Sequence, residues 1–132
     1  MNKRILIVDQ SKTIQVILSQ YFMNAGHQVI SCSTQEEALQ ILGSVRGAPD
    51  LIMLTIGVRK ETCRVAIHVR GCVAYAQTHL IAMVLPEEKA SIQRTLSGLN
   101  ISYLVKPFRL QDVQVLCHRL FSSLDMLSKK EA

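Results

Sequence analysis

Residues 5–13 read Ile-Leu-Ile-Val-Asp-Gln-Ser-Lys-Thr, an unbroken apolar run that passes directly into polar residues. A short apolar run of this kind is typical of a strand buried on both faces of a parallel sheet. From Lys12 onward the apolar residues recur at helical spacing, and Gly26 ends the pattern. The segment therefore predicts a β-strand joined by a short turn to an α-helix. That turn is not a glycine-rich phosphate loop, so the sequence does not favour a nucleotide-binding protein.

Four further strand and helix patterns follow in alternation. The predicted strands are 27–32, 51–54, 80–85 and 102–105. The predicted helices begin at a capping box formed by Thr34 and Glu37, extend over 65–73, open at Pro86, and run from about Gln111 to Lys129. Strands alternating with helices predict an α/β fold of the (βα)5 type, with helices on both faces of a doubly wound, five-stranded parallel sheet.

The size and composition of the chain fit one folded domain. It has 132 residues, of which 48% are hydrophobic and 19% charged, with a formal net charge of +5. We expect a single domain over 1–132, in which 125–132 are an extension of the last helix or a tail. No apolar run approaches the ~18 residues of a membrane span, and the first run is too short for a signal peptide, so we expect a cytoplasmic protein without membrane contact. The four cysteines form no C-x-x-C pair, so neither a disulfide framework nor a zinc site is predicted.

The candidate site lies where the predicted strands end. In doubly wound sheets, ligands bind beyond the carboxyl ends of the strands, close to the point where the strand order reverses. In this sequence the rule selects residues after the first, third, fourth and fifth strands, among them Asp9, Gln10, Thr55, Val84 and Lys106. We therefore treat these five positions as the candidate functional pocket.

Three segments resemble the receiver domain of bacterial response regulators, of the chemotaxis-regulator type. They are residues 5–13, Ala-Pro-Asp-Leu-Ile-Met-Leu at 48–54 and Tyr-Leu-Val-Lys-Pro-Phe at 103–108. The likeness covers residues 3–124 and implies the flavodoxin-like strand order 2-1-3-4-5, with a role in two-component or phosphorelay signalling. It also implies the family's activity, the acceptance of a phosphoryl group on an Asp at the end of the third strand. Two further acids hold Mg²⁺, and a Lys and a Ser or Thr hydroxyl receive the phosphoryl oxygens.

Matched position by position, the sequence keeps two of these five groups. Asp9 stands at the first acid and Lys106 at the lysine, whereas Gln10 replaces the second acid, Thr55 the acceptor and Val84 the hydroxyl. The formal charge of the site changes from −2 to zero, so we expect weak or absent Mg²⁺ binding and no cofactor. Thr55 is a weak nucleophile unless a base lies beside it, and the sequence places none there. We therefore predict a degenerate pseudo-receiver that is not phosphorylated and is not an enzyme, in which Asp9 and Lys106 form an ion pair.

The resemblance also implies a signalling face formed by the fourth helix, the fifth strand and the fifth helix. Tyr103, Pro107 and Phe108 belong to this face, and a cis peptide bond is implied between Lys106 and Pro107. We expect the face to bind a signalling protein, which would be a histidine kinase, an output domain or another regulator. A homodimer through the same face is the other possibility.

Two alternative functions stay open. Thr55 would serve as an unusual phosphoryl acceptor if Glu87 assisted it. A basic region around the third helix would bind an anionic small ligand, through Arg59, Lys60, Arg64 and Arg70. Aromatic residues are sparse in that region, so a nucleic-acid partner is not expected. The sequence does not identify the partner, the pathway or the oligomeric state.

Overall fold

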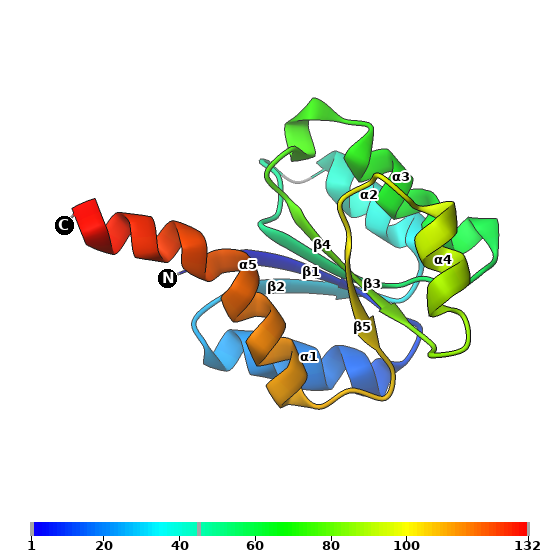
Figure 1. Cartoon of the computed structure of the whole chain (residues 1–132), viewed down its shortest axis with the longest axis horizontal. Helices are drawn as coiled ribbons and strands as arrows, with labels where there is room; N and C mark the ends of the chain where they lie inside the picture. The colour runs from blue at the N-terminus through cyan, green and yellow to red at the C-terminus, as the bar shows by residue number, and fades with distance from the viewer. Residues whose placement is uncertain (1, 45, 132) are drawn as a thin grey trace.

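A five-stranded parallel sheet organises the chain, seen here in a computed structural model that describes residues 2–44 and 46–131, with side chains as far as Phe121. The strand order is β2-β1-β3-β4-β5, and every pair of neighbours is parallel (Figure 1). The strands are β1 (Arg4–Val8), β2 (Gln28–Cys32), β3 (Leu51–Thr55), β4 (His79–Val84) and β5 (Ser102–Val105). This arrangement confirms the fold class predicted from the sequence and the strand order that the resemblance implied.

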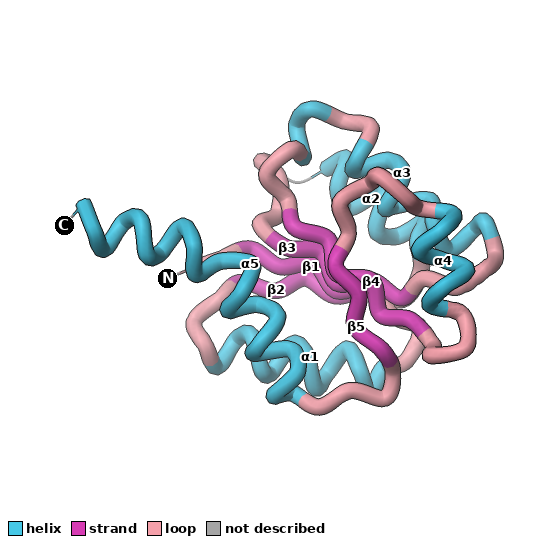
Figure 2. The backbone as a smooth tube through the Cα atoms, in the orientation of Figure 1, coloured by secondary structure: helices cyan, strands magenta, loops and turns pink. Residues whose placement is uncertain are grey.

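Helices cover both faces of the sheet, as a doubly wound fold requires. They are α1 (Lys12–Asn24), α2 (Gln35–Ser44), α3 (Arg64–Arg70), α4 (Lys89–Thr95) and α5 (Leu110–Glu131), with short 3-10 turns η1 (Lys60–Cys63) and η2 (Val73–Tyr75). Helices α1 and α5 lie on one face, and α2, α3 and α4 lie on the other (Figures 1 and 2). The second half of α5 projects past the sheet (Figure 1).

Each strand supplies side chains to both cores because successive side chains of a strand point to opposite faces. In β1, Leu6 and Val8 pack beneath α2 and α3, whereas Ile5 and Ile7 pack beneath α1 and α5. The central strand β3 is buried from Leu51 to Leu54. Its unbroken apolar sequence is therefore explained by burial on both faces rather than on one.

Side chains fix the starts of α1 and α2. Ser11 Oγ accepts a hydrogen bond from the backbone N–H of Ile14 at 3.3 Å, which caps α1. Thr34 Oγ1 accepts from the backbone N–H of Glu37 at 3.1 Å, and the Glu37 carboxylate accepts from the N–H of Ser33. The capping box predicted at the start of α2 is thus confirmed.

The start of α4 differs from the prediction. We predicted a helix that opens at Pro86, but α4 begins at Lys89. Pro86 instead occupies the second position of a turn in which the N–H of Glu88 donates to the carbonyl of Leu85 at 3.1 Å. The strand before it ends at Val84, and Leu85 is left exposed in the turn. Proline suits the second position of a turn as well as the first turn of a helix, so its place in the sequence did not distinguish them.

The third helix is also shorter than predicted. We predicted a helical pattern that included Val73, but α3 ends at Arg70 and Val73 is 91% exposed in η2. Gly71 follows α3 and its N–H bonds back to the carbonyls of the last helical turn. Among the described residues, no helix is long and apolar enough to cross a membrane.

Candidate functional site

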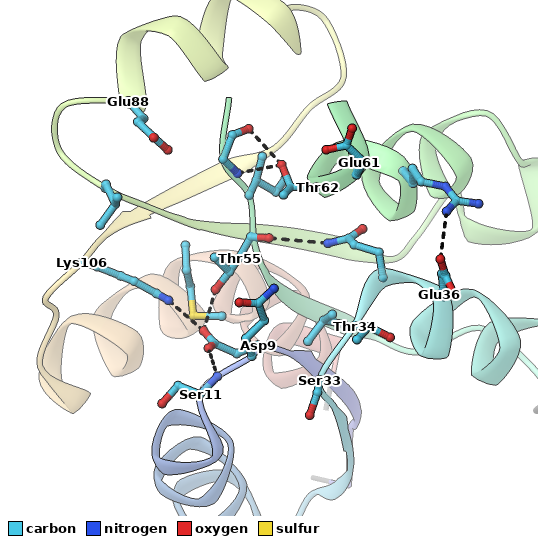
Figure 3. Close-up of a pocket in the computed structure, with 18 residues that line it drawn as sticks. Asp9, Ser11, Ser33, Thr34, Glu36, Thr55, Glu61, Thr62, Glu88 and Lys106 are labelled. Carbon is cyan, nitrogen blue, oxygen red and sulfur yellow. Dashed lines mark hydrogen bonds and ion pairs between the residues drawn. The ribbon is translucent and has the colours of Figure 1, made fainter. Parts of the chain in front are cut away.

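Three of the five candidate residues meet at the carboxyl ends of β1, β3 and β5. Asp9 follows β1, Thr55 ends β3, and Lys106 follows β5 (Figure 3). The backbone N–H of Lys106 donates to the carbonyl of Val84 at 2.8 Å, which holds Lys106 against the end of β4. An open pocket of about 680 Å³ lies above these strand ends. Residues separated by as many as 97 positions in the chain are therefore in direct contact.

The Asp9 carboxylate receives three hydrogen bonds. Its Oδ1 accepts from the backbone N–H of Ser11 at 2.8 Å. Its Oδ2 accepts from Thr55 Oγ1 at 2.5 Å and from Lys106 Nζ at 2.8 Å (Figure 3). The ion pair predicted between Asp9 and Lys106 is confirmed. Both carboxylate oxygens are therefore engaged by groups of the chain itself.

A buried glutamine holds Asp9 from the other side. The Gln15 side chain is 5% exposed, and its amide nitrogen donates to the carbonyl oxygen of Asp9 at 2.7 Å and to Ser33 Oγ at 3.0 Å. It thereby ties the turn after β1 to the turn after β2. Gln15 lies among the apolar residues on the buried face of α1. A polar residue on a buried helix face usually has a hydrogen-bond partner, and this pattern could have identified Gln15 from the sequence.

The electrostatic balance favours an ionised Asp9. Burial by itself would raise the pKa of this carboxyl, but hydrogen bonds from Lys106, Thr55 and Ser11 outweigh it, so the pKa lies below its ordinary value. At neutral pH the carboxylate is therefore charged, and Lys106 balances the charge. The Asp9 side chain is 3% exposed and the Lys106 side chain is 22% exposed. The carboxylate is therefore buried, whereas the lysine is partly open to solvent.

The environment of Thr55 corrects one expectation. We predicted that no base lies beside Thr55, yet its hydroxyl donates directly to Asp9 Oδ2. The two residues are 46 positions apart, so their contact depends on the pairing of β1 with β3 and was not visible in the sequence. A carboxylate whose pKa is lowered is a weak general base, because a base works best when its pKa lies near the operating pH. The contact therefore positions Thr55 without activating it strongly.

Val84 and Gln10 are placed differently from the other three residues. Val84 is fully buried in the core beneath α2, α3 and α4 and does not line the pocket. Its neighbours Met83 and Leu85 line the pocket instead. Gln10 is exposed at the pocket wall, where it offers a neutral amide and no charge. The pocket therefore has no hydroxyl from position 84 and no carboxylate from position 10.

The residues present do not fit a magnesium site. Mg²⁺ requires oxygen ligands in octahedral array, and usually one or two carboxylates with free lone pairs. Asp9 Oδ2 already accepts two hydrogen bonds, one of them from a cation. The described residues contain no group of three or more His, Cys, Asp or Glu side chains placed to hold a metal ion. The ammonium of Lys106 therefore occupies the side of the Asp9 carboxylate where a metal ion would have to bind.

Other acids line the pocket but lie at its rim. Glu61 pairs with Arg59 at 3.3 Å, and both side chains are largely exposed. Glu36 approaches Arg64 at 3.9 Å across the start of α2 and α3. Glu88 lies on the other side of the pocket (Figure 3), and Glu87 is not among the lining residues. Within the described residues, Asp9 is the carboxylate that pairs with Lys106.

The comparisons with known proteins agree with this architecture, although no family model matches the chain. The chain is 27% identical over 114 residues to the sporulation initiation phosphotransferase F of Bacillus subtilis, covering 86% of this chain and 90% of that protein. It superposes on the chemotaxis response regulator CheY4 of Vibrio cholerae with a TM-score of 0.78 at 21% identity, covering 91% of this chain and 99% of that chain. The beryllofluoride-activated DrrB receiver domain gives 0.76 at 18% identity, covering 92% and 99%.

The chain has the fold of a response regulator receiver domain. Within this receiver fold, the Lys106–Pro107 peptide bond is cis, as the resemblance implied. Tyr103 is partly buried against the core beneath α2, α3 and α4, whereas Phe108 packs with α1 and α5. Pro107 is exposed between them. The residues expected at the signalling face of the receiver fold are therefore divided between the two faces of the sheet.

The basic residues near α3 do not form one patch. Arg59 and Arg64 each lie within ion-pair distance of a glutamate. Arg70 turns away from the pocket, and its guanidinium donates to the carbonyls of Thr78 and Leu99, both at 2.8 Å, and of Asn100 at 3.2 Å. Arg70 therefore joins the start of β4 to the connection between α4 and β5. Its short distance in sequence from the other basic residues suggested a shared surface. In the structure, the Arg70 side chain instead holds backbone carbonyls together.

A glutamine that the sequence did not single out links the pocket to α3. Gln35 Oε1 accepts from the backbone N–H of Val65 at 3.0 Å, and its amide nitrogen lies 3.5 Å from the carbonyl oxygen of Thr55. Gln35 thus connects the start of α2 with the end of β3 and the start of α3. On the same side, Thr62 Oγ1 accepts from the N–H of Gly57 at 2.8 Å and closes the loop after β3.

Proposed function

We propose that this chain is a cytoplasmic pseudo-receiver: a receiver-fold module of two-component or phosphorelay signalling that takes up no phosphoryl group and works through protein contacts. The proposal rests first on the receiver fold and on the similarity to the B. subtilis phosphotransferase. It assigns the protein a binding role rather than an enzymatic one. The chemistry of the pocket supports that choice.

One observation carries the proposal: both oxygens of the Asp9 carboxylate already accept hydrogen bonds from the chain itself, from Ser11, Thr55 and Lys106. An acyl phosphate needs a carboxylate at the end of β3. Thr55 occupies that position instead, and its hydroxyl donates a hydrogen bond to Asp9. Phosphoryl transfer to a receiver also needs a cation to neutralise the developing charge. The charges of Asp9 and Lys106 cancel, so the strand-end residues offer a divalent cation no net attraction.

The proposed partner surface is the one formed by α4, β5 and α5. Tyr103 is partly buried there, and burial raises the pKa of its hydroxyl, so the side chain is held in an apolar setting. We infer that this face keeps one form, since no phosphoryl group acts on it. A histidine kinase, an output domain or another regulator would bind it, and a second copy of the chain is the competing occupant.

Direct challenge with phosphodonors tests the proposal. The protein is incubated with Mg²⁺ and acetyl phosphate, and separately with Mg²⁺ and beryllofluoride, and is followed by intact mass and by amide NMR spectra. We expect no added phosphoryl mass and no stoichiometric spectral change. The matched control is the double variant Gln10→Asp/Thr55→Asp, in which two carboxylates join Asp9 and Mg²⁺ binding should appear. A stoichiometric beryllofluoride complex of the natural chain would refute the proposal.

The contact between Thr55 and Asp9 favours one second candidate, phosphorylation of Thr55 by a separate kinase. The hydroxyl lies beside a carboxylate, and the pocket above it is open. Assistance by Glu87 has no support, because Glu87 is exposed and does not line the pocket. The two candidates differ in the stability of the adduct: phosphothreonine survives acid, whereas an acyl phosphate hydrolyses. An acid-stable adduct mapped to Thr55 would favour the second candidate over the first.

A further inference from the structure

The outer edge of β2 lacks three features that protect many sheet edges: charged side chains, proline and a bulge. Natural edge strands carry lysine, proline, inward-pointing charges or bulges that discourage pairing with another strand. Residues 28–32 read Gln-Val-Ile-Ser-Cys, with no charge and no proline, and the strand pairs in regular register with β1. Ile30, at its centre, is 44% exposed. The strand is therefore open to pairing on its free side.

The backbone groups of β2 can be assigned to its two sides from the hydrogen bonds it makes. The N–H of Gln28 donates to the carbonyl of Lys3, and the carbonyl of Cys32 accepts from the N–H of Asp9. Gln28 and Cys32 therefore direct their backbone groups towards β1. Because these directions alternate along a strand, Val29 and Ser31 direct theirs to the free edge. An added strand would bond to these two residues.

We propose that β2 is a homodimerisation edge, at which the β2 strands of two copies pair antiparallel about a two-fold axis centred on Ile30. In this register Val29 of one copy exchanges both backbone hydrogen bonds with Ser31 of the other, and Ile30 lies opposite Ile30. Ile30 is then the non-hydrogen-bonded pair, in which side chains approach most closely. The register is complementary to itself, which a symmetric dimer requires.

An apolar groove beside β2 gives the paired isoleucines a place to pack. A groove of about 280 Å³ lies between β1, β2 and α2, and Ile30, Ile41, Leu42 and Pro49 are among its lining residues. Pairing would cover Ile30 of both copies and extend the apolar surface of the groove across the axis. Burial of apolar surface of this kind is the main driving force for association.

The charges along α2 favour a second copy as the occupant of this edge. Near the start of α2, Glu37 lies one helical turn before the groove residue Ile41, and the opposite end of the groove carries Arg4, with Arg46 exposed just after the helix. A two-fold axis brings the acidic end of each α2 beside the basic end of the other. The two helix dipoles are then antiparallel as well. The β2 dimer uses the edge opposite β5, so it leaves the proposed partner surface free and does not depend on the chemistry of the pocket.

Sedimentation velocity of the full chain, from about 10 μM to about 1 mM, tests the proposal because a dimer becomes dominant as concentration rises. We expect a mass twice that of one chain at the upper end. Ile30→Lys places two like charges opposite each other and should weaken association at least about tenfold. Circular dichroism checks that the variant is folded. The matched controls are Val115→Lys on α5 and Gln93→Lys on α4, which should leave association unchanged.

A cross-linking pair tests the register independently. Ile30→Cys puts two cysteines opposite each other at the roughly 4.5 Å Cα separation of a non-hydrogen-bonded pair, which a disulfide can span. It should form a covalent dimer under mild oxidation at least about tenfold faster than Ser31→Cys, whose cysteine faces Val29. Arg46→Glu should weaken the dimer, and Glu37→Lys/Arg46→Glu, checked for folding by circular dichroism, should restore it. A monomer at about 1 mM, a dimer that survives Ile30→Lys, or loss of the dimer in a control variant would each overturn the proposal.

Discussion

Replacing Lys106 by methionine is the sharpest test of how the pocket is stabilised. The change keeps an unbranched side chain, one atom shorter than that of lysine, and removes the cation that contacts Asp9 Oδ2 at 2.8 Å. Breaking a fully buried ion pair on one side costs about 3–5 kcal/mol, because the remaining charge is left uncompensated. Here the Lys106 side chain is 22% exposed, and Asp9 keeps hydrogen bonds from Ser11 and Thr55. We therefore expect a smaller loss of unfolding free energy, about 2–3 kcal/mol at neutral pH.

The pH dependence of this loss identifies its cause. The pKa of Asp9 lies below its ordinary value of 3.8, so the ionised form contributes stability above that value and the contribution is lost as the pH falls through the folded-state pKa. In Lys106→Met the burial of Asp9 acts with less opposition, the pKa of Asp9 rises, and protonation in acid relieves the unpaired charge. The difference in stability between the two proteins should therefore shrink as the pH falls from 7 towards about 3.

Urea unfolding followed by circular dichroism, repeated across this pH range, measures the effect. Lys60→Met is the matched control, because Lys60 is exposed and a surface change of this kind alters stability by less than about 0.5 kcal/mol. A Lys106→Met protein that loses less than about 0.5 kcal/mol at pH 7 would refute the reasoning. So would a loss of constant size across the pH range, because it would then come from packing rather than from the charge of Asp9.

Three further outcomes are expected. Thr55→Val should lower the unfolding free energy by about 1–2 kcal/mol in urea titrations, because Asp9 loses a hydroxyl donor, and an unchanged or higher stability would contradict the observed contact. Arg70→Met should lower the unfolding free energy by about 2 kcal/mol and speed amide hydrogen exchange in the connection between α4 and β5. Arg70→Lys should recover less than half of the lost stability, because an ammonium cannot span several carbonyls. Burial raises the pKa of Cys32 to about 11, so iodoacetamide at neutral pH should alkylate the partly exposed Cys72 before the buried Cys32. Peptide mapping by mass spectrometry measures this order, and preferential labelling of Cys32 would contradict it.

The receiver fold also explains why some local predictions were wrong. Pro86 and Val73 each fit a helix by local rules, yet the chain uses one in a turn and leaves the other exposed in η2. Near a helix end, propensity differences are small, and the packing of neighbouring elements decides where the helix begins or stops. The four basic residues around α3 were grouped by sequence distance, whereas the direction of Arg70 depends on the carbonyls that β4 and β5 bring to it.

The sequence by itself determined the alternation of strands and helices, the burial of the strands on both faces, and the residue types at the strand ends, among them Gln10, Thr55 and Val84. These are short-range properties, since periodicity and residue type act over one element at a time. Only the tertiary structure decided that Thr55 donates to Asp9, that Lys106 reaches the same oxygen, and that Val84 is buried in the core. Thr55 and Lys106 lie 46 and 97 positions from Asp9 in the chain. Their contacts with Asp9 therefore depend on which strands are neighbours in the sheet and on where the side chains point at the strand ends. Periodicity within one element contains no information about either.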